Sequence, residues 1–507
     1  MDAEKKRMLF EKIENLHSYL WSSTIFVKSS QSVVDLWNEH LMLRNKIEEI
    51  TLLQNRESSN VSYDREKFLR PFIKWSKRMK IKQNGIAIKY DDDIKGFKLE
   101  TIFSVQKDTN VLQVPRKAIL SWDVARKSPM LKFFFKIVEL RKCFENHIVV
   151  RSMENVALAL MLCCEKLRPD SMWHAYINIL PIIYDTPLFY ELDEMKSLFP
   201  SPAYEDSLLF YRNISRQFIS FLMEIASTDK QFSDVRFQIN FFWRSNFNKE
   251  ESAMFAETPL TVNNFTFELY RWAVSSVSTR INLIPSKIAV DEIGNPLLVP
   301  SLIPFLDMAN HEHFSGIPDF NVVYFSVQED CAKLMAIKDY SCNETFNIYY
   351  GNRGNCEFLI HNGFVPSVSE ENNFYSLKLG LPKNSHKKHE ILKKLGFQAK
   401  GSSYQFKLRQ NDSLDSLLLF AKVFVMDDNM ATNSFDMLNS FENIQKAWQF
   451  LHDRFMLLHL AYKTFNNAGY RNLMINRLKQ SEIMILKKAE EFCRNQLKIN
   501  AVSGNNN

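Results

Sequence analysis

Glycine is scarce in this sequence, at 12 of 507 residues. No two glycines are separated by a single residue, so the Gly-x-Gly-x-x-Gly loop of dinucleotide-binding domains is absent, and no Walker sequence occurs either. These absences argue against a doubly wound α/β domain that binds a nucleotide. A low glycine content also predicts a helix-rich chain with few glycine-dependent loops.

Cysteine is also sparse, with seven scattered residues that are never spaced as Cys-x-x-Cys. This usage predicts a reducing compartment and excludes a disulfide framework and a thiolate zinc site. His311 and His313 have no accompanying cluster of His or Cys, so we expect no metal. We expect a cytoplasmic protein and leave nuclear access open.

Neither charge nor hydropathy indicates a nucleic acid or a membrane as partner. Lys plus Arg total 64 against 58 Asp plus Glu, which leaves a net charge of only +6 on a large surface. The best apolar run, at 156–164, is far shorter than the roughly 18 residues that a spanning helix needs. The charged segment 1–7 leads into no apolar signal sequence.

The hydrophobic periodicity changes four times along the chain. Residues 1–75 are predicted to be helical, 85–120 to form strands, 130–280 to be helical, 297–350 to form strands, and the chain after 375 to be helical. Within these regions, helices are predicted at 155–167 and 265–279. Strands are predicted at 86–88, 111–114, 302–306, 320–327, 333–337 and 345–350. This order predicts one β domain whose two halves are separated by a helical insertion, followed by a helical C-terminal domain. In that domain Leu478, Ile485, Ala489 and Phe492 form one stripe.

Two segments stand out once these absences are taken into account. Leu302-Ile303-Pro304-Phe305-Leu306-Asp307-Met308-Ala309-Asn310-His311 is an apolar run that ends in a polar corner, and Asn347-Ile348-Tyr349-Tyr350-Gly351-Asn352-Arg353 follows about 40 residues later. Spacing alone leaves a structural explanation open, in which the first is a hydrogen-bonded turn and the second is strand packing.

Taken together, the two segments resemble the hallmarks of SET-domain methyltransferases, an Asn-His pair after an apolar strand and a Tyr at the end of a later strand. The sequence is most similar to the actin-histidine methyltransferases and their relatives, the Rubisco large-subunit methyltransferases. Further matching segments lie at 114–117, 184–188, 270–277, 279–280, 282, 284–285 and 360–364, and the resemblance spans roughly residues 30–495.

The resemblance implies an α+β fold, with a β-rich SET domain at 76–370 whose C-terminal segment is knotted and which is split by a helical insertion at about 131–280. An N-terminal helical extension at 1–75 precedes it, and an all-α substrate-binding domain at 371–500 and a disordered tail at 501–507 follow it. The cofactor implied is S-adenosyl-L-methionine. The implied substrate is a protein such as actin, docked on the SET domain and the helical C-terminal domain of a monomer.

The resemblance also implies roles for individual residues. Tyr350 and Asn282 would be catalytic, and Arg353, Leu306 and Ile348 would bind the substrate. The residues implied to hold the cofactor are Glu100, Ser128, Pro129, Met130, Arg280, Asp307, Met308, Ala309, Asn310, His311, Asn362, Gly363 and Phe364. An imidazole with a pKa of about 6.5 is mostly neutral at pH 7, so a histidine-directed enzyme needs to fix the tautomer and needs no strong base.

Three positions depart from the family pattern. Lys98 stands where a glycine is usual, Glu100 replaces an arginine, and Leu306 replaces the tryptophan of the actin-directed enzymes. These changes leave two alternatives to actin-histidine methylation. One is a lysine methyltransferase, and the other is a SET protein of weak or no activity that acts as a binding module.

Overall fold

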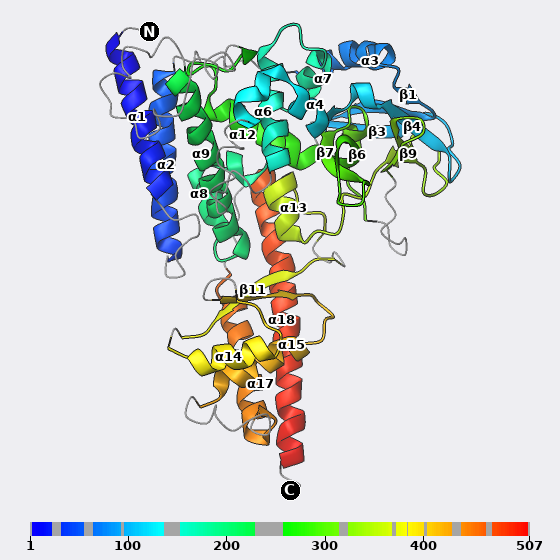
Figure 1. Cartoon of the computed structure of the whole chain (residues 1–507). Coiled ribbons are helices and arrows are strands. Elements are labelled where there is room, and N and C mark those ends of the chain that lie inside the picture. Colours follow the sequence, from blue (N-terminus) through cyan, green and yellow to red (C-terminus); the bar gives the residue numbers. More distant parts are fainter. Residues whose placement is uncertain are drawn as a thin grey trace. The chain divides into compact units, whose positions relative to one another are not determined.

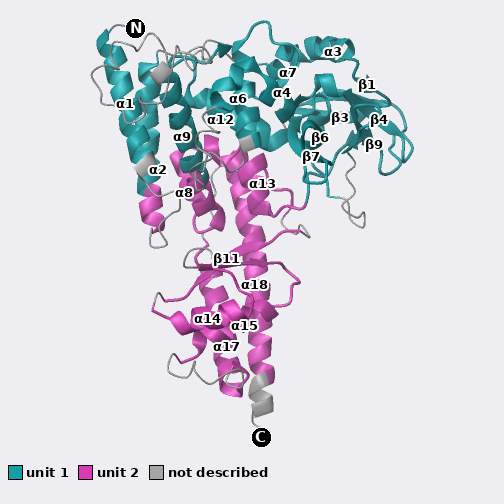
Figure 2. Ribbon diagram, in the orientation of Figure 1, with its two compact units in different colours: residues 1–25, 38–184, 210–351 teal, residues 26–37, 185–209, 352–507 magenta. Residues whose placement is uncertain are grey.

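The structure is a computed structural model, and it divides into two compact units (Figure 2). Unit 1 comprises residues 1–25, 38–184 and 210–351, and unit 2 comprises residues 26–37, 185–209 and 352–507. The described residues are 3–22, 32–54, 64–92, 96–135, 153–228, 257–313, 323–367, 372–382, 384–399, 403–427, 438–462 and 469–504.

The described chain contains both helices and antiparallel sheets, which confirms the predicted α+β class (Figure 1). The helices are α1 (Ala3–Ser22), α2 (Val33–Leu53), α3 (Leu69–Arg78), α4 (Trp122–Lys127), α6 (Met153–Leu167), α7 (His174–Ile179), α8 (Leu192–Ser197), α9 (Pro202–Thr228), α12 (Phe267–Arg280), α13 (Asn355–Asn362), α14 (His386–Lys394), α15 (Asp415–Val425), α17 (Phe441–Leu460) and α18 (Tyr470–Gly504). The strands are β1 (Lys82–Gln83), β2 (Ile86–Asp91), β3 (Gly96–Thr101), β4 (Asn110–Pro115), β5 (Leu120–Ser121), β6 (Ile281–Val290), β7 (Pro296–Leu302), β8 (Val323–Ser326), β9 (Cys331–Met335), β10 (Thr345–Phe346), β11 (Tyr375–Gly380) and β12 (Ser403–Leu408).

Strands far apart in the sequence pair with one another in unit 1. The three sheets have the orders β1-β4-β9-β8, β10-β3-β2 and β5-β7-β6, and each contains strands from both sides of the long helical stretch. Strands from the two predicted β regions, 85–120 and 297–350, therefore pair within the same sheets. The predicted knot of the C-terminal segment stays a prediction.

Helices α6 and α12 form part of the core next to these sheets. Residues 156–164 of α6 are all buried, so the longest apolar run of the sequence is a core helix. The side chain of Thr266 caps α12 by accepting a hydrogen bond from the Leu269 N–H at 3.2 Å. Helix α12 ends at Arg280 and β6 starts with the next residue, so the helix sets the position of that strand.

The predicted strand at 302–306 is wrong. Strand β7 ends at Leu302, and a short 3-10 helix occupies Leu306–Met308. Phe305 has φ +77°, a left-handed conformation that an extended strand does not allow. The strand predicted at 345–350 is also shorter, because β10 covers only Thr345–Phe346.

The region after residue 375 is not purely helical, as had been predicted. Strands β11 and β12 pair over six residues each, and Tyr375, Leu377 and Leu379 are buried on one face with the period of two that a strand requires. Helix α18 continues to Gly504, so the predicted tail is helical at 501–504, and 505–507 lie outside the described residues. In the predicted stripe, Phe492 is exposed and its neighbour Cys493 is buried instead.

Unit 2 has its own hydrophobic core between β11, β12 and the helices α14, α15, α17 and α18. Its boundary at residue 352 precedes the predicted domain boundary at 371, and residues 185–209 of the predicted insertion also belong to it. The part of the insertion at 136–152 and 229–256, and residues 320–322 of the predicted strand at 320–327, lie outside the described residues.

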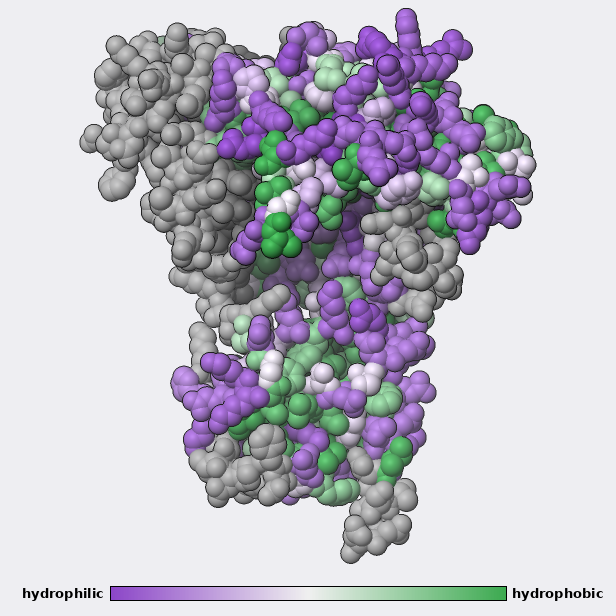
Figure 3. All heavy atoms as spheres, turned by 45° about the vertical axis from the view of Figure 1, so that its right-hand side comes forward, coloured by the Kyte–Doolittle hydropathy of each residue, from purple (hydrophilic) through white to green (hydrophobic). Residues whose placement is uncertain are grey.

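The described surface carries both hydrophilic and hydrophobic side chains. Hydrophilic side chains surround smaller groups of hydrophobic ones on the face drawn in Figure 3. No described helix combines the length and the apolar character that spanning a bilayer would require.

Candidate active site

The turn after β7 is folded inward. Phe305 and Leu306 are fully buried, and the Asp307 N–H donates to the Ile303 carbonyl at 3.2 Å, which closes the turn. The positive φ of Phe305 reverses the chain just before the acidic residue. As a result, the Asp307 side chain is directed into the protein and is buried.

The two sequence motifs lie side by side. The Ile348 N–H donates to the Asn310 carbonyl at 2.8 Å, and the Glu312 N–H donates to the Ile348 carbonyl at 3.0 Å. These bonds form a parallel bridge between His311 and Ile348. The Asn-His pair is thereby held against the segment that carries Tyr349 and Tyr350.

Tyr350 is fixed at both its backbone and its hydroxyl. Its N–H donates to Nδ1 of His311 at 3.2 Å, and its hydroxyl donates to the Ala309 carbonyl at 2.7 Å. The His311 and Tyr350 rings lie 5.2 Å apart between their centroids. The hydroxyl hydrogen is therefore engaged, and its oxygen lone pairs face away from that carbonyl.

The buried Asp307 carboxylate interacts electrostatically with Arg280, which is half-buried. The Tyr176 hydroxyl donates to Oδ2 of Asp307, and Nη1 of Arg280 donates to Thr279 Oγ1 at 2.7 Å and to the Tyr184 hydroxyl at 3.5 Å. Burial raises the pKa of Asp307 to about 6, although Arg280 and the hydrogen bond from Tyr176 act in the opposite direction. The carboxylate is therefore ionised at neutral pH and titrates just below it.

Asn282 lies two residues after Arg280, in β6. Its Nδ2 donates to the Arg280 carbonyl at 3.1 Å, and its own carbonyl accepts from Ser301 Oγ at 3.1 Å. A backbone carbonyl only accepts, so the NH₂ end of the amide must face Arg280. Oδ1 is consequently the end that faces elsewhere.

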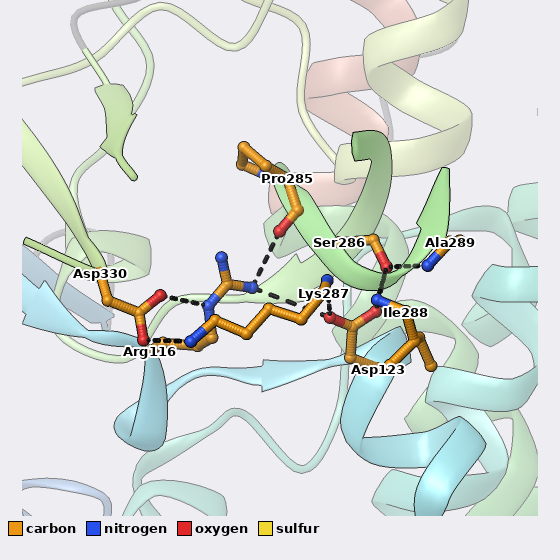
Figure 4. A network of polar contacts seen from close by, with 8 residues as sticks. All are labelled: Arg116, Asp123, Pro285, Ser286, Lys287, Ile288, Ala289 and Asp330. Carbon is orange, nitrogen blue, oxygen red and sulfur yellow. Dashed lines mark hydrogen bonds and ion pairs between the residues drawn. The ribbon is translucent and has the colours of Figure 1, made fainter. Parts of the chain in front are cut away.

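A polar network fixes the far part of β6, where its register against β7 shifts between Pro285 and Val290 (Figure 4). The Asp123 carboxylate accepts from Ser286 Oγ at 2.6 Å and from the Lys287 N–H at 2.7 Å. Arg116 donates to the Pro285 carbonyl at 2.8 Å. The strand that carries Asn282 is therefore anchored on the C-terminal side of that residue.

Asp330 completes the same network. It accepts from both Arg116 and Lys287, at 2.7 Å each (Figure 4). Asp330 belongs to the turn between β8 and β9, so the network ties β6 to a second sheet.

The two unusual residues of β3 lie close together, and Lys98 faces two carboxylates. Nζ of Lys98 lies 3.0 Å from Oδ2 of Asp91 in β2 and 3.6 Å from Oε2 of Glu100, which shares one face of β3 with Lys98. Glu100 is paired in register with Thr345 of β10, the strand that leads to Tyr350. The sequence therefore places a lysine and a glutamate that interact with each other at this position, and not a lone reversed charge.

Ser128 precedes a short 3-10 helix at Pro129–Leu131, which contacts α6. Ser128 Oγ accepts from the Met130 N–H at 3.3 Å, and Nη1 of Arg168 donates to the Met130 sulfur at 3.8 Å. Pro129 is the first residue of this 3-10 helix. Its lack of an N–H costs nothing there, because the first N–H groups of a helix have no partner within the helix. The role of Ser128, Pro129 and Met130 in cofactor binding stays a prediction.

The remaining predicted residues, Arg353 and Asn362 to Phe364, lie in unit 2. Nη1 of Arg353 donates to Oδ1 of Asn362 at 2.7 Å, so the structure brings these two together. Gly363 ends α13 with φ +82°, and a Cβ there would lie 2.8 Å from the Asp185 carbonyl carbon. Only glycine fits this position.

Asp307 and Arg280 together have the chemistry that S-adenosyl-L-methionine requires. Nε of Arg280 and Oδ1 of Asp307 are buried and make no hydrogen bond within the described part of the chain. The amino-acid end of the cofactor carries one ammonium and one carboxylate. Oδ1 of Asp307 suits the ammonium and Nε of Arg280 suits the carboxylate, so these residues fit the cofactor.

Sequence reasoning did not identify Tyr176. It lies in a predicted helical stretch, where a buried tyrosine has the same pattern as any core aromatic residue. Tyr184 was within a matching segment, but nothing in the sequence indicated that its hydroxyl lies beside Arg280.

The chain is similar in sequence to proteins of known function. A scan against models of protein families finds no match. The actin-histidine N-methyltransferase of Danio rerio is 30% identical over 446 residues, which cover 84% of this chain and 67% of the relative. The protein of the same name from Homo sapiens is 29% identical over 485 residues, which cover 89% of this chain and 73% of the relative.

Solved structures show the same fold. The SET domain of LSMT, crystallised with lysine and AdoHcy, matches with a TM-score of 0.62 at 17% identity and covers 85% of this chain and 92% of that chain. Rubisco LSMT bound to AdoMet matches with a TM-score of 0.59 at 16% identity, with 85% and 93% covered. With relatives at this identity over most of both chains, and with this fold, the chain belongs to the actin-histidine N-methyltransferase family of SET-domain proteins.

Proposed function

We propose that this protein transfers a methyl group from S-adenosyl-L-methionine to an imidazole nitrogen of a histidine in actin or a similar protein. The observation that carries the proposal is the arrangement of Asn282, Arg280, Asp307 and Tyr350 in a chain that belongs to this family. When bound, the cofactor supplies an electrophilic methyl group on a sulfonium.

Asn282 is the residue that selects the tautomer of the acceptor. Its NH₂ end is engaged with the Arg280 carbonyl, so Oδ1 is the end that accepts the N–H of the substrate imidazole. An imidazole with its proton held at that nitrogen carries a free lone pair on the other nitrogen, which is the one that attacks. Methyl transfer leaves the imidazole with a positive charge. The imidazole then becomes neutral by losing to water the N–H proton that Asn282 accepts.

Tyr350 orients the acceptor side of the reaction. Because its hydroxyl donates to the Ala309 carbonyl, the hydroxyl oxygen presents lone pairs and not a proton. Such an oxygen accepts weak C–H···O contacts from a polarised methyl group. Most of the chain's contribution is thus alignment and the exclusion of water, and no strong base is required.

The proposal includes the predicted surroundings of the reaction. The protein substrate docks on the SET domain and on the helical C-terminal domain, with Arg353, Leu306 and Ile348 at the acceptor, and the enzyme is a cytoplasmic monomer. Leu306 is fully buried, which supports a role in shaping the pocket wall and not in direct solvent-exposed contact.

A labelling experiment tests the proposal. The purified protein is incubated with actin and with methyl-labelled cofactor, and the modified residue is identified by mass spectrometry. We expect label on a histidine, and strong loss of label with Tyr350→Phe and Asn282→Ala. Label on lysine would replace the histidine assignment, and no cofactor binding by calorimetry at millimolar concentration would exclude catalysis.

A further inference from the structure

We propose that Tyr176 is a positioning residue, which holds the Asp307 carboxylate in the orientation that the cofactor and the 306–311 turn require. This inference rests on the proposed function, because it assigns a role at the same site. It adds a residue from helix α7, far from both sequence motifs.

The Tyr176 hydroxyl has little freedom. The residue is fully buried in α7, and its ring stacks on Trp75 with centroids 6.5 Å apart and planes inclined by 19°. The ring also lies 6.3 Å from that of Phe72. The indole N–H of Trp75 is itself bonded to the Met172 carbonyl at 2.6 Å, so the stacking partner is held in place.

The hydroxyl therefore presents its proton to Oδ2 of Asp307 at a fixed position. This bond leaves Oδ1 of the same carboxylate as the end that faces the cofactor. Without the donor, the carboxylate would rotate, and its negative charge would be stabilised by fewer groups.

Asp307 is faced by a small set of charged and titratable groups. They are Arg280 from α12, Tyr176 from α7 and, more remotely, Tyr184. The Tyr184 hydroxyl is hydrogen-bonded to Ser276 Oγ at 2.7 Å, and the positive charges of Arg280 and Arg65 act to lower its pKa.

Asp307 is coupled to Tyr350 through the adjacent chain and to Asn282 through its electrostatic interaction with Arg280. Ala309, two residues on, holds the Tyr350 hydroxyl at 2.7 Å, and the partner charge Arg280 holds the Asn282 amide by its carbonyl. A shift of the carboxylate would therefore move both the acceptor side and the cofactor side. The raised pKa of Asp307 makes the state of this carboxylate measurable near neutral pH.

The test is Tyr176→Phe in the full chain, with Tyr270→Phe as the matched control. Both remove the hydroxyl of a fully buried tyrosine in unit 1. The Tyr270 hydroxyl donates to Gln217 Oε1 at 2.8 Å and does not touch Asp307. Cofactor affinity is measured by calorimetry from pH 5 to 8, together with kcat, KM and thermal stability.

We expect wild-type cofactor affinity to fall below pH about 6, where Asp307 becomes protonated. In Tyr176→Phe, the loss of a hydrogen bond to a charged group moves this midpoint upward by about one to two pH units. Tyr270→Phe should lose similar stability and keep the wild-type midpoint.

Identical midpoints in all three proteins would overturn the inference, and so would equal shifts in both variants. If Tyr176→Phe does not fold, Asp307→Asn is the second variant. Its cofactor affinity should show no dependence on pH in this range, and a pH dependence that persists in Asp307→Asn would overturn the inference, because Asp307 would not be the group that controls affinity. If the midpoint shifts in Tyr176→Phe and not in Tyr270→Phe, but the wild type transfers no methyl group to histidine, the proposed function fails and the inference about Tyr176 stands.

Discussion

Replacement of Asn282 by aspartate is the sharpest test of the proposed mechanism. Asp has nearly the same shape as Asn and keeps an oxygen that accepts the imidazole N–H, but it carries a negative charge. It also loses the NH₂ group that bonds to the Arg280 carbonyl. The wild-type amide selects a tautomer without changing charge, whereas the variant carboxylate stabilises a protonated imidazole.

The size of the effect follows from the acceptor pKa. An imidazole with a pKa of about 6.5 is about three-quarters neutral at pH 7. A carboxylate within hydrogen-bonding distance raises that pKa by about 1.5 units, to about 8, which leaves roughly a tenth of it neutral. The neutral fraction, and with it kcat/KM, falls about eightfold at pH 7, and this part of the loss disappears near pH 9.

The assay is methyl transfer to actin between pH 6 and 10, with Asn282→Ala as the comparison. Asn282→Ala lacks both ends of the amide and should lower kcat/KM about tenfold at every pH, because one buried hydrogen bond is lost without a new charge. If Asn282→Asp shows the same pH profile as wild type, Asn282 does not contact the acceptor imidazole. The tautomer mechanism is then refuted.

Three further changes have defined outcomes. Tyr350→Phe keeps the ring but removes the hydroxyl, and should lower kcat about tenfold with little change in the cofactor Kd, as judged by single-turnover kinetics and calorimetry. Gly363→Ala should destabilise unit 2 by about 2 kcal/mol or more in urea unfolding, because the left-handed φ is unfavourable and the new Cβ meets the Asp185 backbone. Arg212→Met should cost about 3–5 kcal/mol in the same measurement, because it leaves the buried Glu39 carboxylate, 2.9 Å from Arg212 Nε, without its cation. A loss below about 1 kcal/mol for either stability variant would contradict its assignment.

Patterns that act over a few residues were read correctly from the sequence. The helices predicted at 155–167 and 265–279 correspond to α6 and α12, whereas β6, which directly follows α12, was not predicted. The Asn310-His311 and Tyr349-Tyr350 segments indicated a SET domain because such motifs combine several rare residue types at one place.

Errors arose where local pattern and tertiary packing differ. Residues 302–306 are apolar enough for a strand, but the chain turns at Phe305 because a buried turn, not an extended strand, places Asp307 inside. Strands β11 and β12 were predicted as helix, since short apolar alternation between helices is ambiguous without its pairing partner.

The sequence by itself determined the fold class, the family resemblance and the identity of Tyr350, Asn282 and Asp307 as candidates. Only the tertiary structure decided that the NH₂ end of the Asn282 amide bonds to the Arg280 carbonyl, that Lys98 lies between Asp91 and Glu100, and that Tyr176 bonds to Asp307 across 131 residues of chain. The reason is physical: a residue's type sets what it can bond to, but the direction of each bond depends on which distant groups the folded chain brings within about 3 Å.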